Sequence, residues 1–204
     1  MDKLAGLADS LFAIAQNGLL FTKDPFDKER YQQIQKIAAS ILADKSAWST
    51  DKILNLFCNE KGYATPKLDV RGAVFQGDRI LLVKERSDNL WTLPGGWVDM
   101  NESPSEAICK EIVEESGFIT RAIKLMAVWD MHKHAHPSQL PHTYKLFFIC
   151  ALLGGEKRTS IETSEIDFFE KDNLPELSLR RVIKPQIERA FEHKQNMQLP
   201  TDFD

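Results

Sequence analysis

The sequence predicts an α/β fold, an α/β/α sandwich built on a mixed sheet and preceded by a small all-helical N-terminal domain. Three observations lead to this expectation. Residues 1–65 have helical periodicity and little else. From residue 66 onward, apolar and β-branched runs of strand length replace that pattern. One sharply bounded helix lies among these runs, and an amphipathic helix follows the last of them. Because the pattern changes near residue 66, we expect two domains, 1–65 and 66–204.

Apolar residues at three- and four-residue steps predict the helices of the N-terminal domain. The first helix carries Leu4, Leu7, Leu11 and Ile14, and the second carries Tyr31, Ile34, Ala38 and Ile41. The turn-like KDPFD separates them, and a third helix is expected from Ser49, a suitable N-cap, to Gly62. Three short helices form only a small core, so their apolar faces are expected to pack on the rest of the chain or on a second copy. A helix-turn-helix that reads nucleic acid is disfavoured, because acids and bases balance across the segment.

Five apolar runs predict the strands of the second domain. LDVRGAVF and RILLVKE are separated by the turn residues QGD, which predicts a hairpin. IKLMAVWD, TYKLFFICALL and EIDFFE predict three further strands. A last amphipathic helix is expected from about Ser178 to Lys194.

The charge, the cysteines and the length of the apolar runs exclude several function classes. With a formal charge of −4 and interspersed acids and bases, the chain has no basic stripe for nucleic acid or an anionic membrane. Cys58, Cys109 and Cys150 are far apart in apolar surroundings, which favours reduced thiols. No apolar run reaches the roughly 18 residues of a membrane span, and MDKLAGLADS lacks the features of a signal peptide. We therefore expect an unprocessed cytoplasmic protein that does not contact a membrane.

One helix of the second domain has explicit boundaries in the sequence. Ser103 and Glu106 form a capping box, and Pro104 takes the first helical position. Gly117 supplies a left-handed stop. The expected helix therefore runs from 104 to 116.

This predicted helix has an acidic face and an apolar face. At about 100° per residue, Glu111, Glu114 and Glu115 fall within an arc of roughly 100°. The apolar side is expected to carry Cys109, Ile112 and Val113. Carboxylates this close repel one another, and Lys110 lies off the acidic arc. A bound cation is therefore expected to offset the repulsion.

The chemistry of the acidic face indicates which cation it would hold. Carboxylate oxygens without histidine or cysteine nearby suit Mg²⁺ or Mn²⁺ rather than zinc. The preceding LPGGW contains two glycines, which let the backbone approach a ligand and free a carbonyl to point at the metal. Because bound Mg²⁺ keeps open positions that substrate phosphates fill, the sequence predicts a site where a metal ion and a phosphate meet.

The residues around this helix resemble the Nudix box, the signature of hydrolases that act on a nucleoside diphosphate linked to another moiety X. The match spans 23 residues and consists of Gly96, Glu102, Lys110, Glu111, Ile112, Glu114, Glu115, Gly117 and Phe118. Lys110 is the one departure, because the family usually has arginine there; lysine keeps the charge but loses the planar two-pronged grip. AQNGLLFTKDPFDKERYQQI is similar to the helical extension of a Nudix subgroup that includes CDP-choline and ADP-ribose pyrophosphatases.

The resemblance implies a Nudix domain at 66–204 and a metal-dependent pyrophosphohydrolase for a substrate of CDP-choline or ADP-ribose type. The products would be a nucleoside monophosphate and a phosphorylated X, with Mg²⁺ or Mn²⁺ as cofactor. The implied metal ligands are Glu111, Glu114, Glu115 and the backbone carbonyl of Gly95, with Glu102 and Lys110 in supporting roles. The subgroup also implies a homodimer in which the helical extension takes part.

The box does not identify the general base or the residues that bind substrate. Glu114 and Glu115 are candidate bases. Glu165 and Asp167 are candidates too, because family members often present a late acidic residue; a solvated acid at a strand end is the alternative reading of Glu165. Candidate substrate contacts are Arg71, Arg86, Trp91 and His132. A surface or ion-pair role is the alternative for each arginine, core packing is the alternative for Trp91, and a polar loop is the alternative for His132.

Two other functions stay open at this point. A nucleotide-binding module without catalysis is disfavoured because all four box glutamates are present. RNA processing, by exonuclease action or cap removal, is disfavoured because the net negative charge weakens binding to a phosphate backbone, so RNA is expected as a secondary substrate at most.

Overall fold

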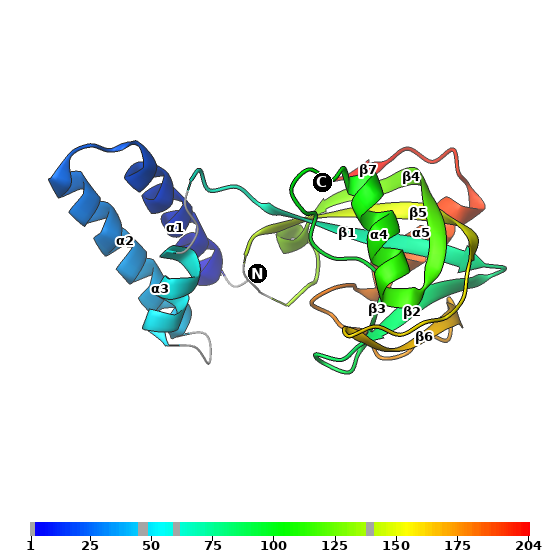
Figure 1. Ribbon diagram of the computed structural model, residues 1–204. Helices are drawn as coiled ribbons and strands as arrows, with labels where there is room; N and C mark the ends of the chain where they lie inside the picture. Colours follow the sequence, from blue (N-terminus) through cyan, green and yellow to red (C-terminus); the bar gives the residue numbers. More distant parts are fainter. Residues whose placement is uncertain (1–2, 45–48, 59–61, 138–140) are drawn as a thin grey trace. The chain divides into compact units, whose positions relative to one another are not determined.

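The computed structural model describes residues 3–44, 49–58, 62–137 and 141–204, without the side chains of residues 3 and 56–58. The chain divides into two compact units, Met1–Pro66 and Lys67–Asp204. Figure 1 shows helices α1 to α3 in the first unit and a sheet with helices in the second. The predicted α/β class, with an N-terminal helical region, is confirmed.

Two long helices and one short helix make up the first unit. They are α1 (Lys3–Phe21), α2 (Pro25–Ala43) and α3 (Thr50–Cys58). The predicted turn KDPFD connects the first two, and the Asp24 side chain caps α2 by accepting hydrogen bonds from the N–H groups of Phe26 (2.8 Å) and Asp27 (3.0 Å). The helices approach closely at Gly18, where an added Cβ would lie 2.3 Å from a ring carbon of Tyr31.

The apolar stripe predicted on α1 is not the buried face of that helix. Leu4, Leu7 and Ile14 are 46, 52 and 58 % exposed, whereas Ala8 and Ala15 are fully buried. Close helix packing favours small residues, and this selects the alanine face over the leucine face. The leucine stripe (Leu4, Leu7 and Ile14) is therefore an exposed apolar surface.

The same helix corrects the expectation that no apolar run has the length of a membrane span. The 18-residue stretch Leu4–Phe21 is long and apolar enough to cross a bilayer. The core helix of a soluble protein and a signal sequence pass the same test, so the stretch by itself is weak evidence for a span.

The third predicted helix is present and is described over Thr50–Cys58. Ser49 is its N-cap, with its Oγ accepting a hydrogen bond from the N–H of Lys52 (3.3 Å). Residues 59–61, together with the side chain of Cys58, lie outside the described residues. Gly62 has a φ of 106° and is not helical.

The second unit contains a mixed sheet. Its strands are β1 (Lys67–Gln76), β2 (Arg79–Glu85), β3 (Trp91–Thr92), β4 (Phe118–Asp130), β5 (Thr143–Gly155), β6 (Thr163–Glu170) and β7 (Asp202–Phe203). The order is β3-β2-β1-β5-β4-β7, and β6 pairs with β2. β1 runs parallel to β5 and antiparallel to β2, which confirms the predicted hairpin. The two-residue strands β3 and β7 were not predicted, because such short pairings leave no periodic pattern in the sequence.

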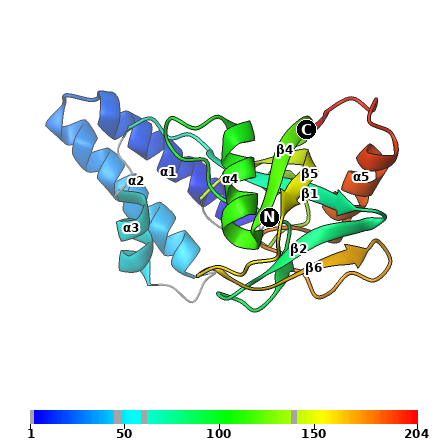
Figure 2. The ribbon, with the colours of Figure 1, turned by 45° about the vertical axis from the view of Figure 1, so that its right-hand side comes forward.

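Helices cover both faces of this sheet. Figure 2 shows α4 (Pro104–Ser116) on one face and α5 (Lys184–Gln195) on the other. One core forms between the sheet and α5, which contributes Ile187, Ala190 and Phe191, and a second core forms under α4. The sandwich expected from the sequence is therefore present. Of the described cysteines, Cys109 and Cys150 are free thiols.

The last helix begins later than predicted. We expected it to start near Ser178, but α5 begins at Lys184. Pro185 explains the difference, because proline lacks a backbone N–H and is tolerated only in the first turn of a helix. The segment before it forms no helix and instead reaches the cavity described below.

The boundaries of α4 agree with the prediction in every detail. Ser103 Oγ accepts a hydrogen bond from the Glu106 N–H (3.3 Å), and the Glu106 carboxylate accepts one from the Ser103 N–H (3.0 Å). At the other end, Gly117 has a φ of 77° and donates its N–H to the carbonyl of Val113. The helix runs over Pro104–Ser116, as the local cap chemistry predicts.

The buried face of α4 is rotated from the one expected. Its buried residues are Ala107, Ile108, Ile112, Glu115 and Ser116. Val113, predicted to lie in the core, is only half-buried. Glu115, predicted to lie opposite Ile112, is about 60° from it around the helix axis and turns toward the sheet. One of the three acidic side chains is therefore placed inside the protein.

Candidate active site

A cavity of about 920 Å³ opens in the second unit beside α4. It is of the size that small-molecule sites have in proteins. Residues of α4, of the turn after β3 and of the sheet line it, together with parts of the loops. They are Glu111, Glu114 and Glu115 of α4; Gly95, Gly96, Trp97 and Asp99 of the turn; Asp69, Arg71, Glu85, Thr143 and Lys145 of the sheet; and Ser87, Asp88, Leu90, Pro137, Glu162 and the segment 176–181. Carboxylates and cations from distant parts of the sequence therefore meet in one space.

Glu115 is the most buried of the three α4 carboxylates, with 3 % of the residue exposed. Its Oε2 accepts a hydrogen bond of 2.9 Å from the backbone N–H of Gly95. Gly95 has a φ of 139°, and an added Cβ would lie 1.9 Å from the carbonyl oxygen of Val70, so only glycine fits there. The predicted residues Gly95 and Glu115 are in direct contact.

The acidic cluster formed by Glu111, Glu114 and Glu115 is electrostatically unfavourable when all its carboxylates are charged, which favours binding of protons or of a cation. Burial, and next to it the charge of Glu114, raises the pKa of Glu111 to about 7. Burial raises the pKa of Glu115 to about 8, although the Arg71 guanidinium acts in the opposite direction. Near neutral pH this cluster therefore takes up protons unless another positive charge binds.

The donor set fits a divalent cation with oxygen ligands. Glu111, Glu114 and Glu115 all line the cavity, and no histidine or cysteine is among its described lining residues. Gly96 faces Glu111 closely, because a Cβ there would lie 3.0 Å from Oε1. The absence of a side chain at Gly96 leaves space beside that carboxylate.

The two residues predicted to support the box contact each other. Lys110 Nζ lies 2.9 Å from Glu102 Oε1 and 3.3 Å from Asp99 Oδ2. These hydrogen bonds, first to Glu102 and then to Asp99, raise the pKa of Lys110. The pair ties α4 to the loop that precedes it, which agrees with a supporting role.

Arg71, a predicted substrate contact, lines the cavity together with Asp69 and Lys145, which were not predicted. Arg71 donates to both carboxylate oxygens of Asp69, at 2.9 and 2.7 Å, and to the carbonyl of Leu93 at 3.2 Å. Lys145 Nζ lies 3.1 Å from Asp69 Oδ1. The sequence signal that was overlooked is a pair of charges, at 69 and 71, on one face of an otherwise apolar strand.

Four of the residues predicted as catalytic or substrate-binding lie elsewhere in the described chain and do not line the cavity, and neither does the supporting pair Glu102 and Lys110. Glu165 pairs with Lys84 across β2 and β6 at 2.8 Å. Arg86 Nε donates to the carbonyl of Ser160 at 3.3 Å. The Trp91 ring packs edge-on against Phe169, with centroids 4.8 Å apart. The alternative readings describe Arg86, which is exposed, and Trp91, which packs against the core, whereas Glu165 is exposed but held in an ion pair.

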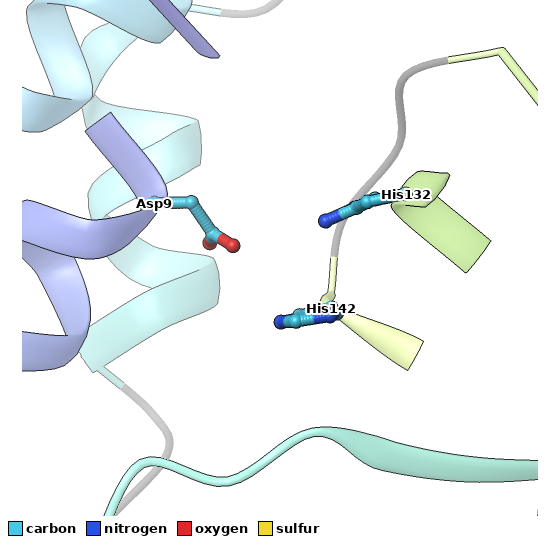
Figure 3. Close-up of side chains that lie close together, drawn as sticks. All are labelled: Asp9, His132 and His142. Carbon is cyan, nitrogen blue, oxygen red and sulfur yellow. The ribbon is translucent and has the colours of Figure 1, made fainter. Parts of the chain in front are cut away.

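The fourth of these residues, His132, stacks on another histidine. Figure 3 shows the parallel rings of His132 and His142, whose centroids are 4.5 Å apart. His142 Nε2 in turn lies 2.9 Å from Asp130 Oδ1. Residues 138–140 of the histidine-containing loop lie outside the described residues.

Two further parts of the cavity were not predicted from the sequence. Glu162, in the turn before β6, lines the cavity and adds to the forces that raise the pKa of Glu111. Arg181 lies 3.1 Å from Glu85 and 2.8 Å from Asp88, and thus holds the segment 176–181 against β2. No spacing rule marks these residues, because the turns decide which side chains reach the cavity.

Comparisons with known proteins cover both units. Residues 2–57 match the family described as "UDP-X-like, N-terminal oligomerisation domain", and residues 65–191 match the NUDIX domain. The chain is 46 % identical over 197 residues to a protein of Bacillus subtilis named putative ADP-ribose pyrophosphatase. That alignment covers 97 % of this chain and 95 % of the relative.

Two solved structures with related names are also similar to this chain. A UDP-X diphosphatase aligns with a TM-score of 0.64 and 34 % identity, over 98 % of this chain and 97 % of the other. An ADP-ribose pyrophosphatase of Streptococcus suis aligns with a TM-score of 0.63 and 41 % identity, over 69 % of this chain and all of the other. With two family matches in sequence order and this likeness over almost the whole length, the chain belongs to the Nudix hydrolase family.

Proposed function

We propose that this protein is a pyrophosphohydrolase that uses Mg²⁺ or Mn²⁺ to cleave a nucleoside diphosphate linked to X. The observation that carries the proposal is the meeting of two groups in one cavity. Three carboxylates extend from α4, and Arg71 and Lys145 extend from the sheet. A metal ion on the carboxylates and a diphosphate beside the cations would balance the charges of both groups.

Each group of residues in the site would have its own role in the reaction. Glu111, Glu114 and Glu115 would hold the metal, which when bound polarises phosphoryl oxygens and lowers the pKa of an attacking water. Arg71 orients a phosphate through its remaining guanidinium N–H groups. Glu162 would accept the proton of that water, because it lines the cavity near Glu111 and the predicted candidate Glu165 does not, while Glu114 and Glu115 would be engaged with the metal.

The relatives support a choice among substrates. Those similar over most of this chain are named for ADP-ribose and for UDP-X. ADP-ribose and UDP-linked compounds are therefore the first substrates to test, and CDP-choline, which the sequence resemblance suggested, is the third. Each would give a nucleoside monophosphate and a phosphorylated X.

A substrate screen tests this proposal. With Mg²⁺, ADP-ribose is expected to give AMP and ribose 5-phosphate, and a UDP-sugar is expected to give UMP and a sugar phosphate, both identified by chromatography. The absence of turnover on every diphosphate, with binding retained, would favour the non-catalytic module. Cleavage of RNA faster than every small diphosphate, at physiological salt, would favour RNA processing instead.

We also infer that the protein is a homodimer held together by its first unit. The exposed leucine stripe of α1 lies within the region that matches an N-terminal oligomerisation domain. Apolar side chains at three- and four-residue spacing suit a helix-to-helix contact with a second copy. The free thiols of Cys109 and Cys150 support the cytoplasm as the compartment of this dimer.

Leu7→Glu is expected to convert the dimer to a monomer, because it places a charge in the apolar contact. Light scattering coupled to gel filtration measures the mass directly. Gln32→Glu, on the exposed face of α2, is the control and is expected to leave the mass at that of a dimer. A wild-type protein that is monomeric at tens of micromolar would contradict the inference.

A further inference from the structure

A buried ion triad of Asp69, Arg71 and Lys145 lies in the cavity beside the acidic cluster of α4, and the charge of Arg71 acts on Glu115. Asp69 of β1 stands directly opposite Lys145 of the parallel strand β5. Arg71 follows two positions later on β1 and points to the same face of the strand. All three residues are at least 96 % buried, and all three line the cavity.

The triad contains one more positive charge than it needs for its own neutrality. Arg71 occupies both oxygens of Asp69, so the guanidinium alone would neutralise that carboxylate. Burial opposes the ionisation of Asp69, but Arg71 and Lys145 together hold its pKa below the ordinary value. Burying a further ammonium group costs stability unless another partner binds it.

The surroundings of the Lys145 ammonium group satisfy it only in part, which a purely structural role does not explain. Burial lowers its pKa to about 8, although Asp69 acts in the opposite direction. An ammonium has three N–H donors, and within the described residues Lys145 makes one hydrogen bond, the 3.1 Å contact with Asp69. Two donors are therefore available to a ligand in the cavity.

We propose that Lys145 and Arg71, held in place by Asp69, form a two-cation subsite for one phosphate group of the substrate. This assignment rests on the proposed function, since it names which residues hold the diphosphate. Arg71 offers planar guanidinium N–H groups, and Lys145 offers a compact charge beside them. The bound phosphate is either that of the nucleoside or that of X, and product titrations distinguish the two.

Lys145→Met tests the subsite, because methionine keeps the unbranched apolar chain and removes the charge. The KM for ADP-ribose is expected to rise at least about 10-fold with kcat changed less than about 3-fold, the size expected for a lost hydrogen bond to a charged group. The melting temperature is expected to stay the same or rise, because Asp69 keeps Arg71. Lys194→Met is the control: its Nζ pairs with Asp78 outside the cavity lining, so KM should not change.

Titrations with phosphate monoesters in the presence of Mg²⁺ separate this inference from the proposed function, because they require no turnover. AMP and ribose 5-phosphate are each titrated into wild type and Lys145→Met by calorimetry. At least about 10-fold weaker binding of one of them supports the subsite and identifies the phosphate held. Unchanged binding of both overturns it, even if the wild-type protein hydrolyses ADP-ribose.

If Lys145→Met does not fold, a second substitution tests the same subsite. Lys145→Gln removes the charge but keeps a hydrogen-bond donor toward Asp69, and it is expected to weaken phosphate binding to the same extent. Binding equal to that of the wild type would overturn the subsite. Lys145→Arg restores the charge and is expected to recover part of the affinity; an affinity as low as that of Lys145→Gln would contradict the subsite.

Discussion

Replacement of Glu115 by glutamine is expected to lower kcat at least about 100-fold, a loss of roughly 2.7 kcal/mol of transition-state stabilisation. The Glu115 carboxylate is buried, contacts the Gly95 N–H, and faces the cavity with Glu111 and Glu114. Glutamine preserves the size of the side chain but removes the charge that would bind the metal. The measurement is steady-state hydrolysis of ADP-ribose with saturating Mg²⁺.

The same substitution is expected to leave the fold intact. Because burial raises the pKa of Glu115 to about 8, an ionised carboxylate there is costly, and a neutral glutamine removes that cost. The melting temperature in EDTA should therefore be unchanged or higher. Glu188→Gln makes the same chemical change on α5, outside the cavity lining, and should alter neither quantity. A near-normal rate for Glu115→Gln would refute its assignment as a metal ligand, and a collapsed melting temperature would show that the carboxylate serves the fold.

Removal of the metal is expected to abolish turnover and to make stability fall as the pH rises. EDTA should stop hydrolysis, and added Mg²⁺ should restore it.

The pH dependence of stability without metal follows from Glu115. Its carboxyl has a folded-state pKa of about 8, above its ordinary value of 4.5, so the folded protein binds this proton more tightly than the unfolded chain does. Its contribution is fully present below pH 4.5 and is lost as the pH rises through 8. Glu111, raised to about 7, acts in the same direction.

Denaturant unfolding in EDTA at pH 6.5 and pH 8 measures this effect. Between these values the free energy of unfolding should fall by about 1 to 2 kcal/mol more in the wild type than in Glu115→Gln. His136, whose pKa burial lowers to about 4, contributes equally to both proteins and cancels in the comparison. Mg²⁺ should flatten the wild-type slope, because a metal binds the deprotonated carboxylates. Parallel slopes for the two proteins in EDTA would contradict the prediction.

Local chemistry explains why so much of α4 could be predicted. A capping box, a proline in the first turn and a left-handed glycine act within a few residues of one another, so Ser103, Pro104 and Gly117 define the helix wherever it packs. The same holds for the hairpin of β1 and β2. The misplaced start of α5 was also local, since Pro185 stood in the sequence and only its consequence was overlooked.

The faces of the helices were harder to predict, because burial depends on what packs against them. The leucines of α1 and Val113 of α4 are apolar, yet the partner elements cover other faces. Glu115 shows the reverse case. Its position turns it toward the sheet, where the backbone N–H of Gly95 receives the carboxylate.

The fold class, the ends of α4, the spacing of Glu111, Glu114 and Glu115, and the family with that spacing could all be predicted from the sequence. These features depend on neighbours a few residues apart, and the chain order specifies such neighbours directly. That Lys145 faces Asp69, and that Glu162 rather than Glu165 reaches the cavity, could be seen only in the folded chain. Those contacts join residues far apart in the chain, and the strand order and turns that unite them come from the packing of the whole domain.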